Sequence, residues 1–435
     1  MAEVSIGRAF TLLARAAPDA VAVRLLDGTV LTRGELDDAA GRLASRWREE
    51  GLPRDGVVVV SLPNGPEAVV AAVAAWKAGA TVQPHRPGTP MPGRPSLVVD
   101  APPRVPAHGV DPSAADPDLA ARSWKVSATS GSTGAPRLVA ASAPSRIDTA
   151  GCTPSFMPAH GVQLVAGPLG HTAPFVYAMR GLMSGHELVV LRHFDAVDWL
   201  TAARQHGVTW GMVVPAMMRA IVRVLPDPPP ALPDLASVLH LGARCPEPTK
   251  RAWIAWLGPE RVWELYAGTE SHGLALVGGE EWLAHPGTVG RGIAGTRFRI
   301  ERDDGTEAAP GEIGLVTMRR DDGPWRTQGD LGHLDDAGRL YLADRADDVI
   351  RLDDRVVHPA DVEAVLEAHP GVEAALVVAR DGVLTGVVQT REVVSVQELT
   401  RWCEQLPFEL RPEAFAYTEE PLRDEMGKAR RSRWR

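Results

Sequence analysis

The chain has 435 residues, a formal net charge of −9, 45% hydrophobic residues and 23% charged residues. This length exceeds one ordinary hydrophobic core, so we expect two or more domains in a soluble globular protein. The negative charge argues against nucleic acid and anionic membranes as partners. The most apolar segment, 68–76, is too short to span a bilayer, and the cysteines lack metal-ligand spacing. We therefore expect a cytoplasmic protein without membrane insertion, disulfides or zinc.

The first part of the chain predicts a βαβ unit. Thr32 and Glu35 have the spacing of a capping box, so a helix is expected to follow them. The unit itself consists of a strand over 57–61, a helix over 66–77 and a strand over 80–82. A stretch rich in proline and glycine, 84–117, then interrupts the alternation, with one short strand predicted at 97–99.

Alternation resumes further along the chain. The predicted elements are strands over 188–191, 209–214 and 238–241, and helices over 199–206 and 217–224. This order predicts an α/β fold whose sheet is largely parallel. From 288 to 342, short strands separated by Gly and Asp turns predict a β-rich subdomain.

The pattern of predicted strands and helices changes after Asp344, and this change marks the predicted domain boundary. We predict a large N-terminal domain over 1–344, built from several subdomains, and a small α+β C-terminal domain over 345–435. The C-terminal domain is expected to contain a helix over 359–368 and a strand over 374–378.

The most informative segment runs from Ser127 to Arg137 and packs hydroxyls, two glycines and one cation into a single loop. Glycines let backbone N–H groups approach an anion, hydroxyls add donors, and Arg137 adds a positive charge. The spacing is not that of a Walker P-loop. Residues 124–126 and 138–141 predict the strands of a hairpin that the loop joins. Composition alone fits both a phosphate-binding loop and a flexible linker.

Five further clusters lie on the same chain. They are PLGHTAPF at 168–175, YAGTE at 266–270, RTQGD at 326–330, DRADDVI at 344–350 and PLRDEMGK at 421–428. Each alone also fits a turn, a charged linker or a solvated tail. In this order, and with the Ser/Thr/Gly loop, they resemble the adenylate-forming superfamily of acyl- and aryl-CoA synthetases, peptide-synthetase adenylation domains and luciferases. The resemblance covers nearly the whole chain and makes 1–344 an adenylation domain and 345–435 a small mobile domain.

The resemblance implies where ATP binds. The β- and γ-phosphates would contact the loop residues Thr129, Ser130, Gly131, Ser132, Thr133 and Gly134, with Arg137 in place of the family's usual Lys. Tyr266 would stack on adenine, and the ribose would contact Asp330 and Arg345. The nucleotide would be bordered by Gly242, Ala243, Arg244, Ala267 and Gly268. Asp347 would be the hinge between the two domains.

The resemblance also implies catalytic residues. Thr269 would contact the α-phosphate, and the carboxylate of Glu270 would hold Mg²⁺, which prefers oxygen ligands. Lys428 would bridge the substrate carboxylate and the α-phosphate and neutralise charge in the transition state. His171 would line the acyl pocket and gate the acceptor channel. The other candidate pocket residues are Phe175, Tyr177 and His240.

The sequence departs from the family pattern after the hinge. Asp353 and Asp354 stand where a turn of small residues is usual. In CoA ligases this turn faces the pantetheine tunnel, so two carboxylates would narrow the tunnel and add negative charge. The sequence therefore predicts transfer to CoA less firmly than it predicts adenylation.

Together these observations predict an acid-activating ligase that uses ATP and Mg²⁺ and forms an acyl-adenylate with release of pyrophosphate. The expected partners are a small carboxylic acid, ATP and an acceptor nucleophile, and CoA is the leading acceptor. Two alternatives stay open. One is an adenylating ligase whose acceptor is an amine or nitrite, and the other is a nucleotide-binding protein that has lost catalysis.

Overall fold

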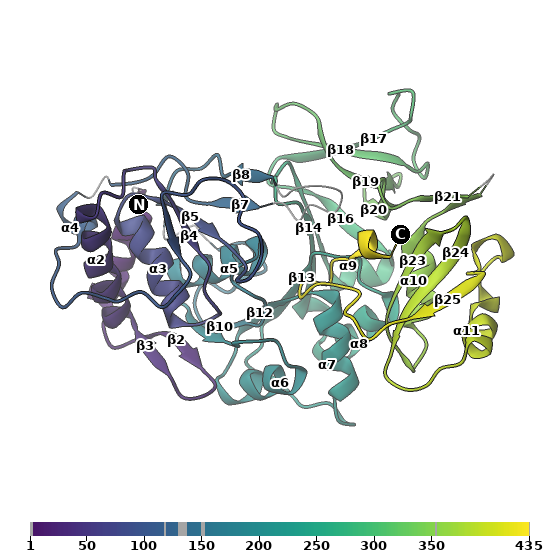
Figure 1. Ribbon diagram of the computed structural model, residues 1–435, viewed down its shortest axis with the longest axis horizontal. Coiled ribbons are helices and arrows are strands. Elements are labelled where there is room, and N and C mark those ends of the chain that lie inside the picture. Colours follow the sequence, from purple (N-terminus) through teal and green to yellow (C-terminus); the bar gives the residue numbers. More distant parts are fainter. Residues whose placement is uncertain (1–2, 117–118, 129–136, 149–152, 353–354, 435) are drawn as a thin grey trace.

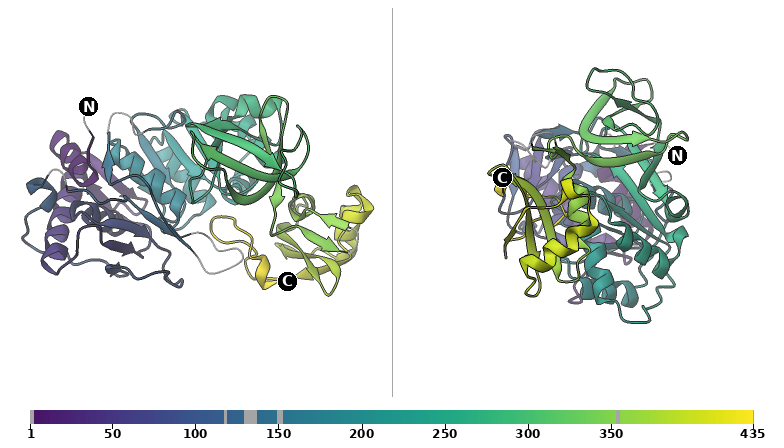
Figure 2. Two further views of the ribbon diagram at one scale, coloured as in Figure 1. Left: turned by 90° about the horizontal axis from the view of Figure 1, so that it is seen from above. Right: turned by 90° about the vertical axis from the view of Figure 1, so that its right-hand side faces the viewer.

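The computed structural model describes residues 3–116, 119–128, 137–148, 153–352 and 355–434 (Figure 1). An α/β body extends to the end of β20 (Leu340–Arg345), and the C-terminal unit that follows lies against one end of this body (Figures 1 and 2). In these ranges, no helix combines the length and the apolar character that a membrane crossing requires.

The predicted βαβ unit is confirmed. Strands β4 (Val57–Val60), β5 (Thr81–Pro84) and β6 (Leu97–Val99) form a parallel sheet in the order β5-β4-β6. Helix α3 (Pro66–Lys77) connects β4 to β5 and is buried from Ala68 to Lys77. A helix that is apolar on every side must be covered on every side. Here α1 (Ile6–Ala16) and α2 (Arg33–Glu49) pack against it.

The predicted capping box is also confirmed at the start of α2. The Thr32 hydroxyl accepts a hydrogen bond from the backbone N–H of Glu35, and the Glu35 carboxylate accepts one from the N–H of Thr32. The remaining elements of this region are short. They are β1 (Val4–Ser5), α4 (Pro112–Ala115), β7 (Val126–Ala128), β8 (Leu138–Ala140) and β9 (Arg146–Ile147). Strands β7 and β8 pair antiparallel, which confirms the predicted hairpin.

A sheet of 13 strands forms the centre of the body, in the order β17-β18-β19-β20-β16-β15-β14-β13-β12-β10-β11-β2-β3. The strands from β14 to β2 in this order are parallel, as the α/β alternation predicted. Their bounds are β2 (Val21–Leu25), β10 (Val162–Val165), β11 (Glu187–Val190), β12 (Trp210–Val213), β13 (Ser237–Leu241) and β14 (Val262–Ala267). Strand β3 (Val30–Thr32) pairs antiparallel with β2 at the edge.

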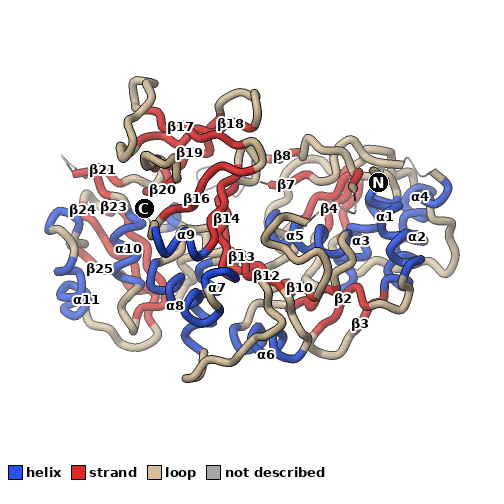
Figure 3. The backbone as a smooth tube through the Cα atoms, turned by 180° about the vertical axis from the view of Figure 1, so that it is seen from behind, coloured by secondary structure: helices blue, strands red, loops and turns tan. Residues whose placement is uncertain are grey.

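Helices cover both faces of the parallel strands. Side chains along β10 and β11 alternate, so that Val165 and Val190 join the hydrophobic cluster around α3 and α5, whereas Leu164 and Val189 join the cluster on the other face. Figure 3 shows α6, α7 and α8 beside these strands. The helices are α5 (Thr172–Met183), α6 (Ala196–Gln205), α7 (Pro215–Val224) and α8 (Glu247–Leu257).

The predicted β-rich region extends the same sheet with antiparallel strands. Its elements are β15 (Leu274–Gly278), α9 (Gly279–Ala284), β16 (Thr288–Ile293), β17 (Thr296–Glu301), β18 (Gly314–Arg320) and β19 (Arg326–Leu334). Strand β20 pairs with β16 and β19. Figure 1 shows β17 and β18 projecting from the body above the C-terminal unit.

The C-terminal unit has its own hydrophobic core, formed by buried residues between Ile350 and Leu406. A sheet in the order β23-β24-β25 packs against helix α10, which matches the α+β texture expected from the sequence. The elements are β21 (Ile350–Leu352), β22 (Arg355–Val357), α10 (Pro359–Glu367), β23 (Val372–Arg380), β24 (Val383–Thr390), α11 (Val396–Trp402) and β25 (Ala414–Tyr417).

Parallel strands place the loops that follow them at one edge of the sheet. The segment after β10 carries His171, the loop after β13 carries Gly242 to Arg244, and the loop after β14 carries Thr269 and Glu270. This topology brings together residues that are far apart in the sequence.

Candidate active site

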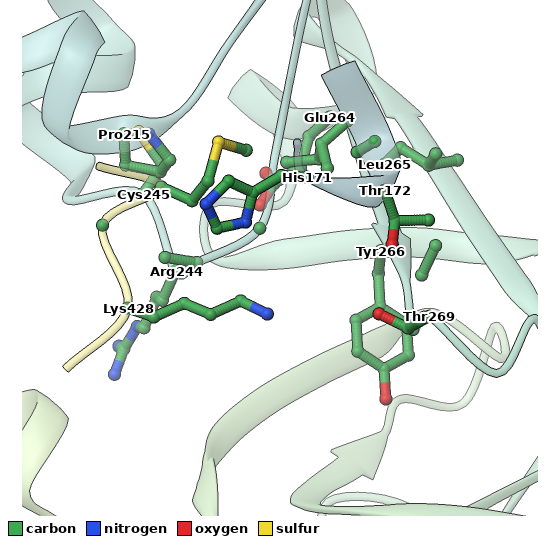
Figure 4. Close-up of a pocket in the computed structure, with 18 of the residues that line it drawn as sticks. His171, Thr172, Pro215, Arg244, Cys245, Glu264, Leu265, Tyr266, Thr269 and Lys428 are labelled. Carbon is green, nitrogen blue, oxygen red and sulfur yellow. The ribbon is translucent and has the colours of Figure 1, made fainter. Parts of the chain in front are cut away.

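A cavity of about 2620 Å³ lies at this edge of the sheet and is lined by both the body and the C-terminal unit. Most of the residues singled out from the sequence line it. They are Arg137, His171, Tyr177, Gly242, Ala243, Arg244, Tyr266, Ala267, Gly268, Thr269, Glu270, Asp330, Arg345 and Lys428. Figure 4 shows the Lys428 side chain extended toward Tyr266 and Thr269, with the His171 ring beside it.

A tight turn presents Lys428. The Asp424 carboxylate accepts hydrogen bonds of 2.9 Å from the backbone N–H groups of Met426 and Lys428. The N–H of Gly427 donates to the Asp424 carbonyl at 2.9 Å, and Gly427 has a φ of +75°, which favours glycine. The turn therefore fixes where the Lys428 side chain begins.

Met426 anchors this turn in the body. Its side chain is 4% exposed and belongs to the hydrophobic cluster around α7 and α8. A Cβ atom at Gly167 would lie 3.6 Å from the Met426 sulfur, and one at Gly427 would lie 3.6 Å from the Cβ of Ala216 on α7. The turn from the C-terminal unit is thus packed into the body, which carries Lys428 into the cavity.

Burial has the largest effect on the pKa of the Lys428 ammonium group. Burial lowers the pKa of Lys428, the Asp424 carboxylate raises it, Arg345 lowers it further and Glu270 raises it. Glu270 and Arg345 therefore act electrostatically on Lys428. A desolvated ammonium group interacts more strongly with a charged ligand than one in water does.

Tyr266, Asp330 and Arg345 form one hydrogen-bonded group. The Tyr266 hydroxyl donates to Asp330 Oδ2 at 2.5 Å, and an Arg345 guanidinium N–H donates to Asp330 Oδ1 at 3.3 Å. Asp330 and Arg345 are paired residues of β19 and β20. Burial and the nearby Asp330 carboxylate raise the pKa of Tyr266, so this hydroxyl stays protonated. Three motifs remote in the sequence meet here.

Gly268 and Gln328 lie against each other, and each marks a departure from the motif it resembles: Ala267 and Gly268 are exchanged relative to the commonest order, and Gln328 separates Thr327 from Gly329. A Cβ atom added at Gly268 would lie 2.0 Å from Oε1 of Gln328. The side chain that separates Thr327 from Gly329 therefore occupies the space beside residue 268, where a larger residue would require Gln328 to move. The N–H of Gly329 donates to the Thr327 hydroxyl at 2.9 Å.

His171 lies at the start of α5, where its backbone N–H donates to the Pro168 carbonyl. Its Nε2 atom is buried and has no hydrogen-bond partner among the described residues. Burial lowers the pKa of His171, while Asp424 raises it and Lys428 lowers it. A neutral imidazole with an unused nitrogen can hydrogen-bond a substrate or acceptor group in the cavity.

Ion pairs join the body to the C-terminal unit beside this cavity. Arg244 donates to Asp361 at 2.6 Å, and Arg219 on α7 forms an ion pair with Glu367 at the end of α10. Arg223 donates to the Val372 carbonyl at 3.1 Å. Arg244, expected from the sequence only as a border of the nucleotide site, therefore also spans this junction.

Two predicted pocket residues do not line the main cavity. Phe175 is 3% exposed, and its ring stacks with Trp124 in the hydrophobic core, because it lies on the opposite face of α5 from Tyr177. His240 is fully buried on β13, with Nε2 3.7 Å from Glu264 Oε2. The side-chain periodicity of a helix and of a strand places Phe175 and His240 on faces that point into the core.

The structure also shows cavity residues that the motifs did not reveal. Lys125 and Arg180 line the cavity, and so does Arg423 of the segment that carries Lys428. The spacing of Tyr177 and Arg180 along one helix face was a usable signal for Arg180. The phosphate-loop residues Thr129 to Gly134 and the pair Asp353 and Asp354 lie outside the described residues.

Comparison with known proteins identifies the class to which this fold and site belong. The sequence matches the AMP-binding enzyme family over residues 10–123 and 124–325. The chain belongs to this family.

Similarity to particular proteins is more distant. The 2-succinylbenzoate–CoA ligase of Bacillus licheniformis is 29% identical over 301 residues, covering 62% of this chain and 61% of that protein. A long-chain-fatty-acid–CoA ligase of Mycobacterium tuberculosis is 28% identical over 260 residues, covering 54% of this chain and 51% of that protein. The matched region thus spans about three fifths or less of the length of these relatives.

Solved structures share the fold along the whole chain. The o-succinylbenzoate CoA synthetase of Bacillus subtilis, in complex with an acyl-adenylate, has a TM-score of 0.79 at 21% identity, with 99% of this chain and 98% of that chain covered. The amide bond synthetase McbA of Marinactinospora thermotolerans has a TM-score of 0.77 at 21% identity, with 99% of each chain covered. The predicted large, sheet-rich α/β fold of adenylate-forming enzymes is therefore confirmed.

Proposed function

We propose that this protein is an AMP-forming acid–CoA ligase. It joins a small carboxylic acid to AMP with release of pyrophosphate, and then transfers the acyl group to the thiol of CoA. The relatives described above are named as CoA ligases, which supports CoA as the acceptor. A cytoplasmic location, where both cosubstrates are available, is part of this proposal, as is the expectation that no nucleic acid is bound.

The observation that carries the proposal is the position of Lys428. A partly buried ammonium group extends into a cavity that also contains Thr269, Glu270 and the group of Tyr266 and Asp330. Such a cation, held where charge develops on a pentavalent phosphorus, stabilises the transition state electrostatically. In our proposal Lys428 bridges the substrate carboxylate and the α-phosphate, and Thr269 donates to the α-phosphate.

The other roles follow the resemblance to adenylate-forming enzymes. Tyr266 stacks on adenine, with Gly242, Ala243, Ala267 and Gly268 admitting the nucleotide closely. Asp330 and Arg345 bind the ribose hydroxyls. On the phosphate side, Arg137 and the loop Thr129 to Gly134 contact the β- and γ-phosphates.

Glu270 is the proposed Mg²⁺ ligand. Its carboxylate lines the cavity, and among the described residues no group of three or more His, Cys, Asp or Glu side chains could hold a metal. A cation at Glu270 would therefore be completed by phosphate oxygens and water, as is usual for Mg²⁺. Mg²⁺ would neutralise phosphate charge during the reaction.

The proposed reaction has two steps. A carboxylate oxygen of the acid attacks the α-phosphorus, a new P–O bond forms, and the bond to the β-phosphate oxygen breaks with loss of pyrophosphate. The CoA sulfur then attacks the acyl carbon, its proton leaves to solvent or a base, and AMP departs with the bridging oxygen. The mixed anhydride provides a good leaving group for this second step.

We further propose that 1–344 and 345–435 act as two domains with a hinge at Asp347. The separate hydrophobic core of the C-terminal unit and the ion pairs at its junction with the body support this division. In the conformation described, the Lys428 turn lies in the cavity, which suits the first step. Rotation about the hinge would withdraw it for the second step.

The test is acid-dependent exchange of pyrophosphate into ATP, followed by thioester formation, over a panel of aliphatic and aromatic acids. We expect exchange with at least one acid and its loss in Lys428→Ala. Nucleotide binding without exchange for any acid would contradict the proposal and favour a catalytically silent nucleotide-binding protein.

A second candidate function rests on Asp353 and Asp354. Two carboxylates at the turn expected to face the acceptor channel disfavour CoA, which carries phosphates, and favour a neutral or cationic nucleophile such as an amine. Under this alternative, amines but not CoA discharge the adenylate, and Asp353→Gly with Asp354→Gly improves CoA transfer. Efficient CoA transfer by the unaltered protein would eliminate it. Nitrite belongs in the same acceptor panel.

A further inference from the structure

Two arginines on either side of the Lys428 turn contact one carboxylate of helix α10. Arg423 precedes the turn and Arg431 follows it. An Arg423 guanidinium N–H donates to Glu363 Oε2 at 3.0 Å. Arg431 donates to the same oxygen at 3.1 Å and also donates to Oε1. Glu363 therefore contacts both ends of the segment that carries Lys428.

The Glu363 carboxylate is buried, and its oxygens are already in use. The residue is 3% exposed, and Oε1 accepts a further hydrogen bond of 2.8 Å from the backbone N–H of Val377 on β23. A carboxylate offers about four acceptor sites, about two on each oxygen. Donors from the protein itself occupy them here, so Glu363 acts on the protein and not on the substrate.

The Arg423 side chain extends these contacts to the turn itself. It donates to the carbonyl of Gly427, directly before Lys428, at 3.4 Å. Arg423 and Ala429 also form an antiparallel bridge, and the N–H of Asp424 donates to the Lys428 carbonyl at 2.9 Å. The backbone of the turn is therefore closed on itself. A shift of the Arg423 guanidinium would displace the backbone from which the Lys428 side chain begins.

Arg431 connects the same carboxylate to the segment at the proposed hinge. Its Nε atom forms an ion pair with Asp348 at 3.3 Å, and Asp348 directly follows Asp347. Arg431 is 7% exposed, so its guanidinium group contacts the carboxylates of Glu363 and Asp348 away from solvent. A planar guanidinium has fixed donor directions, which restrict the relative position of its partners. The contacts thus run from the hinge segment to the Lys428 turn.

We propose that Glu363 is a positioning residue for adenylation: together with Arg423 and Arg431 it holds the Lys428 turn fixed on helix α10. We call these three residues the Glu363 clamp. This inference rests on the proposed function, because the position of Lys428 matters only if the protein forms an adenylate. The clamp makes the turn and helix α10 move as one body when the C-terminal unit rotates about the hinge, so that Lys428 enters and leaves the cavity with the unit.

Glu363→Gln tests the clamp, because it keeps the size of the side chain but turns one acceptor into a donor that faces arginine. We expect kcat for acid-dependent pyrophosphate exchange to fall roughly 10- to 100-fold, since a misplacement of about 1 Å has an effect of this order. KM for ATP and for the acid should change little, and thioester formation from a supplied acyl-adenylate should be unchanged. Glu404→Gln, at an exposed glutamate of the same unit, is the matched control.

Amide hydrogen exchange, measured by mass spectrometry, gives a readout that does not depend on catalysis. In Glu363→Gln we expect faster hydrogen exchange in peptides from 421–431, whereas peptides from β24 and from the body should exchange as in the unaltered protein. Faster hydrogen exchange throughout the C-terminal unit, or equal losses in both half-reactions, would overturn the inference. Either result would show that Glu363 only stabilises the fold.

A second variant covers the case in which Glu363→Gln does not fold. Arg431→Lys keeps a buried positive charge but cannot contact Glu363 and Asp348 together through one planar group. We expect the same selective loss of adenylation and faster hydrogen exchange over 421–431, with a melting temperature close to that of the unaltered protein. Unchanged hydrogen exchange over 421–431 in this variant would overturn the inference.

Hydrogen exchange also separates this inference from the proposed function. If no acid supports pyrophosphate exchange in the unaltered protein, the proposed function fails, while faster hydrogen exchange confined to 421–431 in Glu363→Gln still supports the clamp. If pyrophosphate exchange occurs and Glu363→Gln changes neither its kcat nor hydrogen exchange over 421–431, the ligase proposal stands and the clamp fails.

Discussion

Arg219 and Glu367 are joined by an ion pair that connects helix α7 of the body to helix α10 of the C-terminal unit. Glu367 also accepts hydrogen bonds at 3.2 and 3.1 Å from Arg423, which precedes the turn that presents Lys428. One buried carboxylate thus contacts both the body and the segment that carries the proposed catalytic lysine. The arrangement ties the position of Lys428 to the contact between the two units.

Replacing Arg219 should therefore slow adenylation specifically. In Arg219→Ala, Glu367 keeps Arg423 but loses its partner across the junction, so we expect pyrophosphate exchange to fall roughly 10-fold through weaker seating of the turn. Thioester formation from a supplied acyl-adenylate should be unchanged. Arg204→Ala, which removes an exposed arginine of α6, is the matched control. An equal loss in both half-reactions would contradict this prediction.

Removing the Lys428 ammonium group should have a larger effect on the same step. We expect Lys428→Ala to lower the rate of adenylation by about 10²- to 10³-fold, the usual cost of losing one transition-state contact. Transfer from a supplied acyl-adenylate should continue. Single-turnover measurements of each half-reaction distinguish these steps, and retention of adenylation would remove Lys428 from the mechanism.

The pH dependence of adenylation should also report on Lys428. Burial lowers the pKa of this group, so its charge is lost at a lower pH than that of an exposed lysine. Because the charged form is the active one, exchange should decline as pH rises, beginning below the ordinary lysine range. Lys428→Arg should remove this decline, since arginine stays charged. A profile that is flat to the lysine range in the unaltered protein would contradict the assignment.

Tyr266 should contribute to ATP binding through its hydroxyl as well as its ring. In Tyr266→Phe, Asp330 loses the hydrogen bond measured at 2.5 Å while the ring that would stack on adenine remains. We expect KM for ATP to rise roughly 10-fold with little change in KM for the acid. Steady-state kinetics with each substrate varied in turn check this. A change in KM for the acid alone would show that Tyr266 serves the acyl pocket.

Much of the fold could be predicted from local sequence. The capping box of Thr32 and Glu35, the βαβ unit and the hairpin that begins at β7 depend on short-range hydrogen bonding and periodicity. The direction of single side chains was harder to predict. Phe175 and His240 were expected in the pocket, but the helix and the strand that carry them turn both into the core. Which face of an element is covered depends on distant partners.

The candidate site likewise combines features that the sequence predicts with features that only the folded structure shows. The sequence by itself determined the order of the motifs and which chemical groups are present, including the carboxylate of Glu270 and the ammonium of Lys428. Only the tertiary structure decided that Gln328 fills the space beside Gly268 and that Arg423 and Lys428 line the same cavity as Tyr266. Motifs depend on residue type and short spacing, both of which a sequence displays. Burial, charge proximity and cavity shape arise from packing between remote segments, which exists only in the folded chain.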